Sequence, residues 1–357
     1  MTGRRFSRRI LEAAPLGLLL VIALCDVLLL GSRNVVLGLV VMVPLLAANF
    51  VGPRLTAWYG ILAFVTAVLL GFADQQYEAG TWPSQAVRLV AVAVGGIGGV
   101  LASAYREHRE ARLAQVIRVA EVAQRAILIP VPPELNGVRL AVHYESAASE
   151  AVIGGDLYAA VSTRFGLRVL VGDVRGKGLD AVRLASQVLA AFRERAADRD
   201  DLEALSEDLD RAVRRTAGPE DFVTAVLAQI RPDGGLTLVN AGHPAPFLAR
   251  GRRLTVLEPP EPRPPLGLDG RGTVQQLTLT AEDRLLFYTD GLTEARRPDD
   301  RHFLSDERIA DVFMSAPTLQ DSLAAVRTAL LEWTGGHLTD DVALVAAELA
   351  GPPERRG

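Results

Sequence analysis

Aspartates at the ends of apolar runs are the residues of this 357-residue chain whose types and spacing suit chemistry. They are Asp156, Asp173, Asp290 and the adjacent pair Asp340 and Asp341. Each of them lies beside a glycine or a second carboxylate. A single aspartate at a strand end is usually a turn or cap residue. Four such positions in one chain indicate a shared site.

The chemistry that uses a cluster of carboxylates is the binding of hard cations. Mg²⁺ and Mn²⁺ prefer oxygen ligands and retain several waters, so a few carboxylates suffice for two ions. Two ions about 3.5–4 Å apart can bind a phosphoryl group, activate a water and neutralise charge on the entering and leaving oxygens. The pattern therefore predicts phosphoester hydrolysis.

Strands and helices after Pro130 must bring these positions together. Strands are expected at 138–145, 156–162, 167–173, 222–230, 236–240, 246–249, 274–279, 284–289 and 341–349, and helices at 178–197, 201–216, 306–314 and 319–333. Blocks of strands are separated by pairs of helices, without regular alternation of strand and helix. This order predicts a layered α+β fold.

Five motifs occur in this part of the chain. They are GGDLY at 154–158, GDVRGKG at 172–178, NAGHP at 240–244, FYTDGLTEA at 287–295 and TDDVAL at 339–344. In this order they resemble the bacterial metal-dependent protein phosphatases of the SpoIIE and RsbU type (PPM or PP2C phosphatases), over about residues 124–348. The resemblance implies an α/β/β/α sandwich with two antiparallel sheets and two Mn²⁺ or Mg²⁺ ions, with a third, weaker ion as a further option.

The resemblance also implies roles for the aspartates. Asp173 is expected to bridge both ions, with the Val174 carbonyl helping to hold one of them. Asp290 and Asp340 are expected to complete the metal site. Asp156 is expected to act through metal-bound water or the third ion, which makes Asp156 and Asp173 the catalytic candidates.

Four further positions keep two interpretations each. Asp341 is either a metal ligand or the cap of a turn. Arg175 and Lys177, beside Asp173, are candidate substrate ligands on electrostatic grounds or solvated loop charges. His243 in its Gly-His-Pro setting is interpreted as a positioning residue rather than a proton donor.

The implied activity is that of a protein serine/threonine phosphatase. It would hydrolyse phosphoserine or phosphothreonine on a regulatory protein, such as an anti-sigma-factor antagonist, with water activated by the metal centre. Two alternatives stay open. One is a catalytically silent membrane receptor or scaffold that binds its partner through a phosphatase-like domain, and the other is a small-molecule phosphatase.

The first 104 residues are nearly free of charge except at short loops. Four apolar stretches, Pro15–Leu30, Val35–Val51, Thr56–Phe72 and about Ala86–Ala104, predict an all-α region of four transmembrane helices. Arginines precede the first stretch, separate the second from the third and follow the fourth. By the positive-inside rule, both termini and the catalytic domain are expected in the cytoplasm of a multi-pass cell-membrane protein, with lipid as a partner.

A helical linker is predicted at 105–130, where apolar residues recur at three- and four-residue spacing until prolines end the helix. The stretch 105–129 is interpreted either as a coiled coil that forms a homodimer or as a plain amphipathic connector. The expected organisation is a membrane region at 1–104, the linker, a phosphatase domain at 131–350 and a tail at 351–357.

Composition excludes several other classes of protein. The net charge is −4 and the arginines are interspersed with acidic residues, so no nucleic-acid partner is expected. The single cysteine, Cys25, rules out an intrachain disulfide and a cysteine-based zinc site. A metal in this chain must be held by oxygen or histidine ligands.

Overall fold

The structure is a computed structural model that describes residues 2–28, 37–73, 75–78, 80–146, 154–218, 220–251, 253–297, 301–303 and 308–350. The chain divides into two compact units, Met1–Gln115 and Val116–Gly357. The predicted tail at 351–357 lies outside the described residues.

The first unit consists of helices. These are α1 (Thr2–Leu28), a short 3₁₀ helix η1 (Leu37–Val41), α2 (Met42–Phe50), α3 (Pro53–Ala73) and the first part of α4 (Trp82–Ile127). Three of the described helices are long and apolar enough to cross a membrane, at Leu11–Leu28, Pro53–Ala73 and Trp82–Val119. The second predicted span corresponds to a shorter apolar helix, Gly38–Phe50. Residues 29–36, where the first predicted stretch ends and the second begins, lie outside the described residues.

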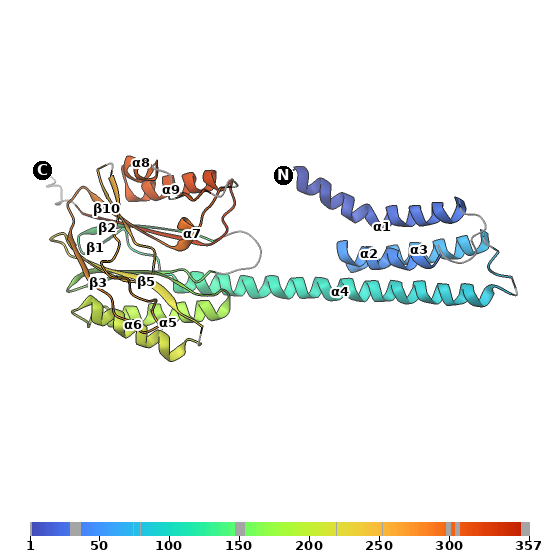
Figure 1. Cartoon of the computed structure of the whole chain (residues 1–357), viewed down its shortest axis with the longest axis horizontal. Coiled ribbons are helices and arrows are strands. Elements are labelled where there is room, and N and C mark those ends of the chain that lie inside the picture. Colours follow the sequence, from blue (N-terminus) through green and yellow to red (C-terminus); the bar gives the residue numbers. More distant parts are fainter. Residues whose placement is uncertain are drawn as a thin grey trace. The chain divides into compact units, whose positions relative to one another are not determined.

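Helix α4 continues from the fourth apolar stretch into the predicted linker without a break (Figure 1). The residues expected to form a helix at 105–129 are therefore part of one 46-residue helix. Leu128 directly after it is buried, and Pro130 stands outside the helix, because proline cannot donate the next helical hydrogen bond.

The second unit contains two antiparallel sheets. The first has the order β1-β2-β11-β10-β7-β8 and the second β3-β4-β5-β6-β9. Their strands are β1 (Glu134–Leu135), β2 (Val138–Glu145), β3 (Leu157–Thr163), β4 (Gly166–Val174), β5 (Val223–Ile230), β6 (Gly235–Ala241), β7 (Phe247–Arg250), β8 (Arg253–Val256), β9 (Gln275–Thr278), β10 (Asp283–Tyr288) and β11 (Val342–Leu349). The sequence pattern does not predict β1 and β8, which are short strands at the two edges of the first sheet.

Pairs of helices cover the outer faces of the two sheets (Figure 1). Helices α5 (Leu179–Arg195) and α6 (Leu202–Thr216) pack on the second sheet, and α9 (Leu319–Trp333), with α8 (Arg308–Ser315) against it, packs on the first. The predicted helix at 306–314 corresponds to α8, although residues 306 and 307 lie outside the described part. The predicted α/β/β/α sandwich is confirmed.

Strand β11 illustrates how the sequence specifies the layers. Its alternate residues Ala343, Val345 and Ala347 join the core between the sheets, and Val342, Leu344 and Ala346 join the core under α8 and α9. Successive side chains of a strand point to opposite faces, so a strand with helices on one face and a sheet on the other is apolar on both. This geometry explains the unbroken apolar run at 342–347.

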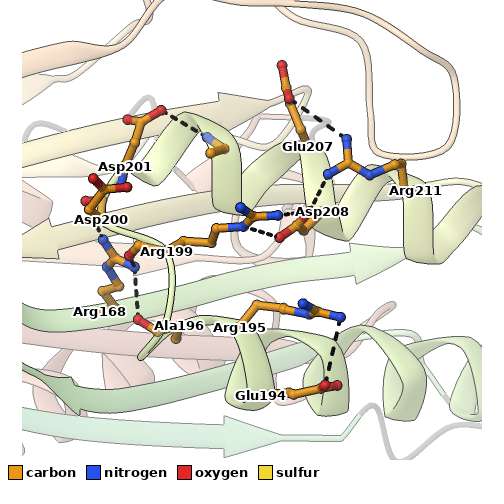
Figure 2. A network of polar contacts seen from close by, with 11 residues as sticks. Arg168, Glu194, Arg195, Ala196, Arg199, Asp200, Asp201, Glu207, Asp208 and Arg211 are labelled. Atoms are coloured by element: carbon orange, nitrogen blue, oxygen red, sulfur yellow. Dashed lines mark hydrogen bonds and ion pairs between the residues drawn. The ribbon is translucent and has the colours of Figure 1, made fainter.

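A fully buried arginine ties strand β4 to the turn between α5 and α6 (Figure 2). The Arg168 guanidinium donates to the carbonyls of Ala196 (2.8 Å) and Asp200 (2.9 Å) and to the side chain of Gln229 (2.9 Å). A buried charge is tolerated only when its donors are satisfied. Arg168 therefore fixes the helix hairpin to the strand that carries Asp173.

We expect Arg168→Met to lower the free energy of unfolding by about 3 kcal/mol, because buried carbonyls lose their donor. For a unit of this size the melting temperature should fall by roughly 6–12 °C, measured by differential scanning calorimetry of the full chain. Arg211→Met is the control, because Arg211 belongs to the same network but its side chain is 48% exposed. Equal losses in the two variants would contradict this assignment.

Candidate metal centre

Three of the predicted aspartates meet where strands of both sheets end. Asp156 directly precedes β3, Asp173 is the penultimate residue of β4, and Asp290 opens the short helix α7 (Asp290–Thr293) after β10. One carboxylate oxygen from each lies within 4.8 Å of the others. The pairing of Leu157 with Gly172 in neighbouring antiparallel strands places Asp156 beside Asp173.

Two glycines permit this close approach. The Gly155 carbonyl accepts a hydrogen bond from the Val174 N–H (3.2 Å), and a Cβ atom on Gly155 would collide with the Val174 backbone. A Cβ atom on Gly291 would collide with the carbonyl of Asp341. Any larger residue at either position would push the aspartate-bearing segments apart.

A threonine that the sequence reasoning missed holds Asp156 in place. The Thr289 hydroxyl donates to Asp156 Oδ2 (2.8 Å) and accepts from the Ala343 N–H (2.9 Å), and Thr289 is completely buried. Asp156 is itself 2% exposed. Thr289 thereby connects a carboxylate at the edge of the second sheet to the first sheet. Thr289 belongs to the FYTDGLTEA motif and directly precedes Asp290, and this position is the sequence signal that could have identified it.

The electrostatics of the cluster disfavour three carboxylate charges. Burial, together with the nearby charges of Asp290 and Asp340, raises the pKa of Asp173 to about 7. Burial and the Asp173 charge raise the pKa of Asp156 well above its usual range, and burial and Asp340 raise that of Asp290. Like charges crowded in a site of low dielectric constant ionise together only when protons or cations neutralise them. The all-oxygen donor set suits Mn²⁺ or Mg²⁺.

The adjacent aspartates Asp340 and Asp341 lie in different surroundings. Asp340 lines the cleft at the cluster, and both of its carboxylate oxygens lie near Lys177 Nζ (3.2 and 3.4 Å). Asp341 is 2% exposed and accepts from the Tyr144 hydroxyl (2.6 Å), the Gly154 N–H (3.0 Å) and the Ser146 hydroxyl (3.1 Å). These bonds suit the capping alternative for Asp341.

A cleft of about 480 Å³ opens over the cluster. Asp173, Asp290 and Asp340 line it together with Val174 and with both basic residues of the loop after Asp173. That loop carries Lys177 and Arg175; the Arg175 guanidinium donates to the Glu220 carbonyl (2.8 Å) and lies 5.2 Å from the centre of the Phe222 ring. The Val174 carbonyl as a metal ligand, and the two basic residues as substrate ligands, stay predictions.

His243 is buried and both of its ring nitrogens are engaged. Nε2 lies 3.0 Å from the Tyr288 carbonyl and Nδ1 lies 3.0 Å from the Thr224 hydroxyl. A carbonyl can only accept, so Nε2 carries the proton and Nδ1 accepts from Thr224. Burial lowers the pKa of His243 to about 4, so the ring is neutral at neutral pH. This arrangement fits the positioning role.

The raised pKa values make cation binding depend on pH. Mn²⁺ binds the ionised carboxylates, so binding should release protons, and affinity should fall as the pH drops from 8 to 6 through the pKa of about 7 at Asp173. Calorimetric titration of the full chain with Mn²⁺, in buffers of different ionisation enthalpy, measures both quantities. Asp173→Asn should release fewer protons. Affinity that is constant across this pH range would contradict the crowding of the carboxylates.

Comparison with known proteins supports the same family. A family model described as Stage II sporulation protein E (SpoIIE) matches residues 163–350. The crystal structure of the RsbU and RsbW domains of Rv1364c from Mycobacterium tuberculosis is 29% identical, with a TM-score of 0.54. The match covers 62% of this chain and 62% of that one.

A second solved structure shows the fold alone. The SiaA-PP2C domain of Pseudomonas aeruginosa is 20% identical with a TM-score of 0.55, and the match covers 67% of this chain and 97% of that one. Asp156 lies before the residues that the family model matches, so its place in the site rests on the geometry described above. Because the model covers more than half of the 357 residues and includes Asp173, Asp290 and Asp340, the chain belongs to the SpoIIE family.

Proposed function

We propose that the chain is a metal-dependent serine/threonine protein phosphatase that hydrolyses phosphoserine or phosphothreonine in a regulatory protein. The observation that carries the proposal is the meeting of Asp156, Asp173 and Asp290 beside an open cleft, with one oxygen of each within 4.8 Å of the others. Membership of the SpoIIE family supports the reaction class.

Two divalent cations are proposed for this site. Asp173 and Asp290, with Asp340 on the same cleft, would hold Mn²⁺ or Mg²⁺, and the Val174 carbonyl would add a neutral oxygen. Such ions, when bound, supply charge to hold phosphoryl oxygens and lower the pKa of a water. Asp156, fixed by Thr289, would hold a third ion or orient water beside Asp173.

Water is the proposed attacking group. Among the described residues that line the cleft there is no serine, cysteine or histidine. The one hydroxyl side chain among them is that of Thr224, which donates to His243 Nδ1 (3.0 Å). Asp173 lines the cleft and Asp156 lies beside it in the cluster, so both remain the catalytic candidates.

Two cations on one loop are proposed to meet the substrate phosphate. Lys177 reaches Asp340 at 3.2 Å, so its ammonium already stands at the edge of the carboxylate cluster. Arg175 lies on the cleft wall with its guanidinium braced by Glu220 and Phe222. Both can donate charge-assisted hydrogen bonds to phosphoryl oxygens.

A regulatory protein is the proposed substrate. The 29% identity to a chain that carries RsbU and RsbW domains supports this class, and an anti-sigma-factor antagonist is the specific candidate. A phosphorylated segment of another protein requires an open cleft rather than an enclosed cavity, and the cleft over the cluster is open to solvent on the side of Lys177 and Glu294.

Three of the helices in the described part of the chain are apolar and long enough to span a bilayer, which indicates membrane association. We propose a multi-pass cell-membrane protein with the catalytic unit in the cytoplasm. The arginine-rich segments before the first apolar stretch and after the fourth lie on the same side of the membrane only if Gly38–Phe50 also crosses the bilayer. At 1.5 Å per residue these 13 residues span about 20 Å of a core of about 30 Å, so neighbouring residues would complete the crossing.

Pairing of two chains through α4 is proposed for the linker residues. The predicted seam consists of the apolar residues at three- and four-residue spacing, Leu113, Val116, Ala120, Ala123 and Ile127. Leu113 and Val116 are 54% and 51% exposed in the single chain. Exposed apolar residues repeating along a helix favour a coiled coil. Ile127, at the end of the seam, packs on Val182 of the catalytic unit instead, so a coiled coil would end before it.

We expect the full chain, purified in detergent, to release phosphate from p-nitrophenyl phosphate and from a phosphoserine protein only when Mn²⁺ or Mg²⁺ is present. Asp173→Asn should lower the turnover number by about three orders of magnitude, which corresponds to roughly 4 kcal/mol of activation free energy. Asp180→Asn is the matched control, because the Asp180 side chain is 93% exposed on the first turn of α5.

Two outcomes would contradict the proposal. A folded chain that binds Mn²⁺ and hydrolyses no phosphoester would favour the silent receptor or scaffold. Turnover of p-nitrophenyl phosphate and small phosphate esters, with none of any phosphoprotein, would favour a small-molecule phosphatase.

A further inference from the structure

The last turns of α4 contact the segment that carries Asp156. Gln124 is 3% exposed, and its side-chain amide donates to the Gly154 carbonyl (3.1 Å). Leu128, four residues later, belongs to the core between the sheets. These contacts all lie within the unit that begins at Val116.

Both backbone polar groups of Gly154 are hydrogen-bonded to side chains. Its carbonyl accepts from Gln124, and its N–H donates to Asp341 Oδ2 (3.0 Å). A Cβ atom on Gly154 would collide with the Asp341 carboxylate, so the peptide and the carboxylate are packed directly together. The Tyr144 hydroxyl fixes the Asp341 carboxylate in turn (2.6 Å).

The next two residues lead directly to the metal cluster. The Gly155 carbonyl accepts from Val174, the neighbour of Asp173, and Asp156 follows. The segment 154–156 has no regular secondary structure, so these hydrogen bonds set its position. Gln124 donates its hydrogen bond from helix α4, whereas the bonds with Asp341 and Val174 come from strands or the segments that connect them.

We propose that Gln124 is a positioning residue for the metal centre, an inference that rests on the proposed function. Its hydrogen bond to Gly154 fixes the segment 154–156, and with it the distance of the Asp156 carboxylate from Asp173 and Asp290. Without this bond the buried Gly154 carbonyl loses its donor and the segment shifts toward other partners. Groups that orient metal ligands typically change metal affinity 10- to 100-fold when they are removed.

The test is Gln124→Met in the full chain, because methionine has a similar length and shape but cannot donate. The half-saturating Mn²⁺ concentration should rise about tenfold for phosphate release, and turnover at saturating Mn²⁺ should recover. Electron paramagnetic resonance of free Mn²⁺ measures the same affinity without turnover. It separates this inference from the proposed activity.

Arg193→Met is the matched control. The Arg193 guanidinium donates to the Ile127 carbonyl (3.0 Å), so it holds the same end of α4 without touching Gly154. Its Mn²⁺ affinity should equal that of the unchanged chain. Equal weakening in both variants would overturn the proposal, because general loosening of α4 would then be the cause. Unchanged affinity in Gln124→Met would overturn it as well.

The behaviour of the unchanged chain distinguishes the two proposals. Mn²⁺ binding without phosphatase activity would refute the proposed function, and the comparison of the Gln124 and Arg193 variants would still decide the role of Gln124. An unchanged chain that binds no Mn²⁺ would refute both.

Discussion

Three carboxylates, one buried and two half-buried, crowd together at the cleft, and much of the second unit is arranged to keep them there. Burial raises the pKa of all three carboxyl groups. The charges of Asp173 and Asp290 also raise the pKa of Asp156, and the Asp290 charge also raises that of Asp173. Folding opposes this repulsion with hydrogen bonds and packing from two sheets. The concentrated negative charge that causes this repulsion also attracts divalent cations. The arrangement that lowers stability is therefore the one that allows metal binding.

The sandwich meets this constraint by taking the aspartates from different strands and bracing each separately. Antiparallel pairing of β3 with β4 sets Asp156 beside Asp173, while Asp290 comes from the end of β10 in the other sheet. Thr289 then joins the sheets through its bonds to Asp156 and to the backbone of Ala343. Neutral donors suit this task because they hold a carboxylate without neutralising it, so the site keeps its affinity for cations.

The carboxylates and the fold class could be predicted from the sequence, because strand-end aspartates beside glycines occur in a recognisable order. The residues that position them could not be predicted in the same way. Thr289 and Gln124 are neutral residues whose partners lie 133 and 30 positions away, and no local pattern specifies such contacts. The second membrane stretch was predicted from apolar composition alone, which does not reveal where a helix begins. Edge strands β1 and β8 are too short for a periodic pattern.

The adjacent residues Asp340 and Asp341 have different surroundings that their shared motif does not predict. The two residues lie just before β11, Asp340 in a bend of the chain and Asp341 next to the strand. The Asp340 carboxylate turns toward Lys177 and the cleft, and the Asp341 carboxylate turns toward Tyr144 and Gly154. Burial and the Asp341 charge raise the pKa of Tyr144, so its hydroxyl keeps the proton that it donates to Asp341. The motif predicts two acidic residues, but only the folded backbone before β11 assigns one to the cleft and the other to the support of the Asp156 segment.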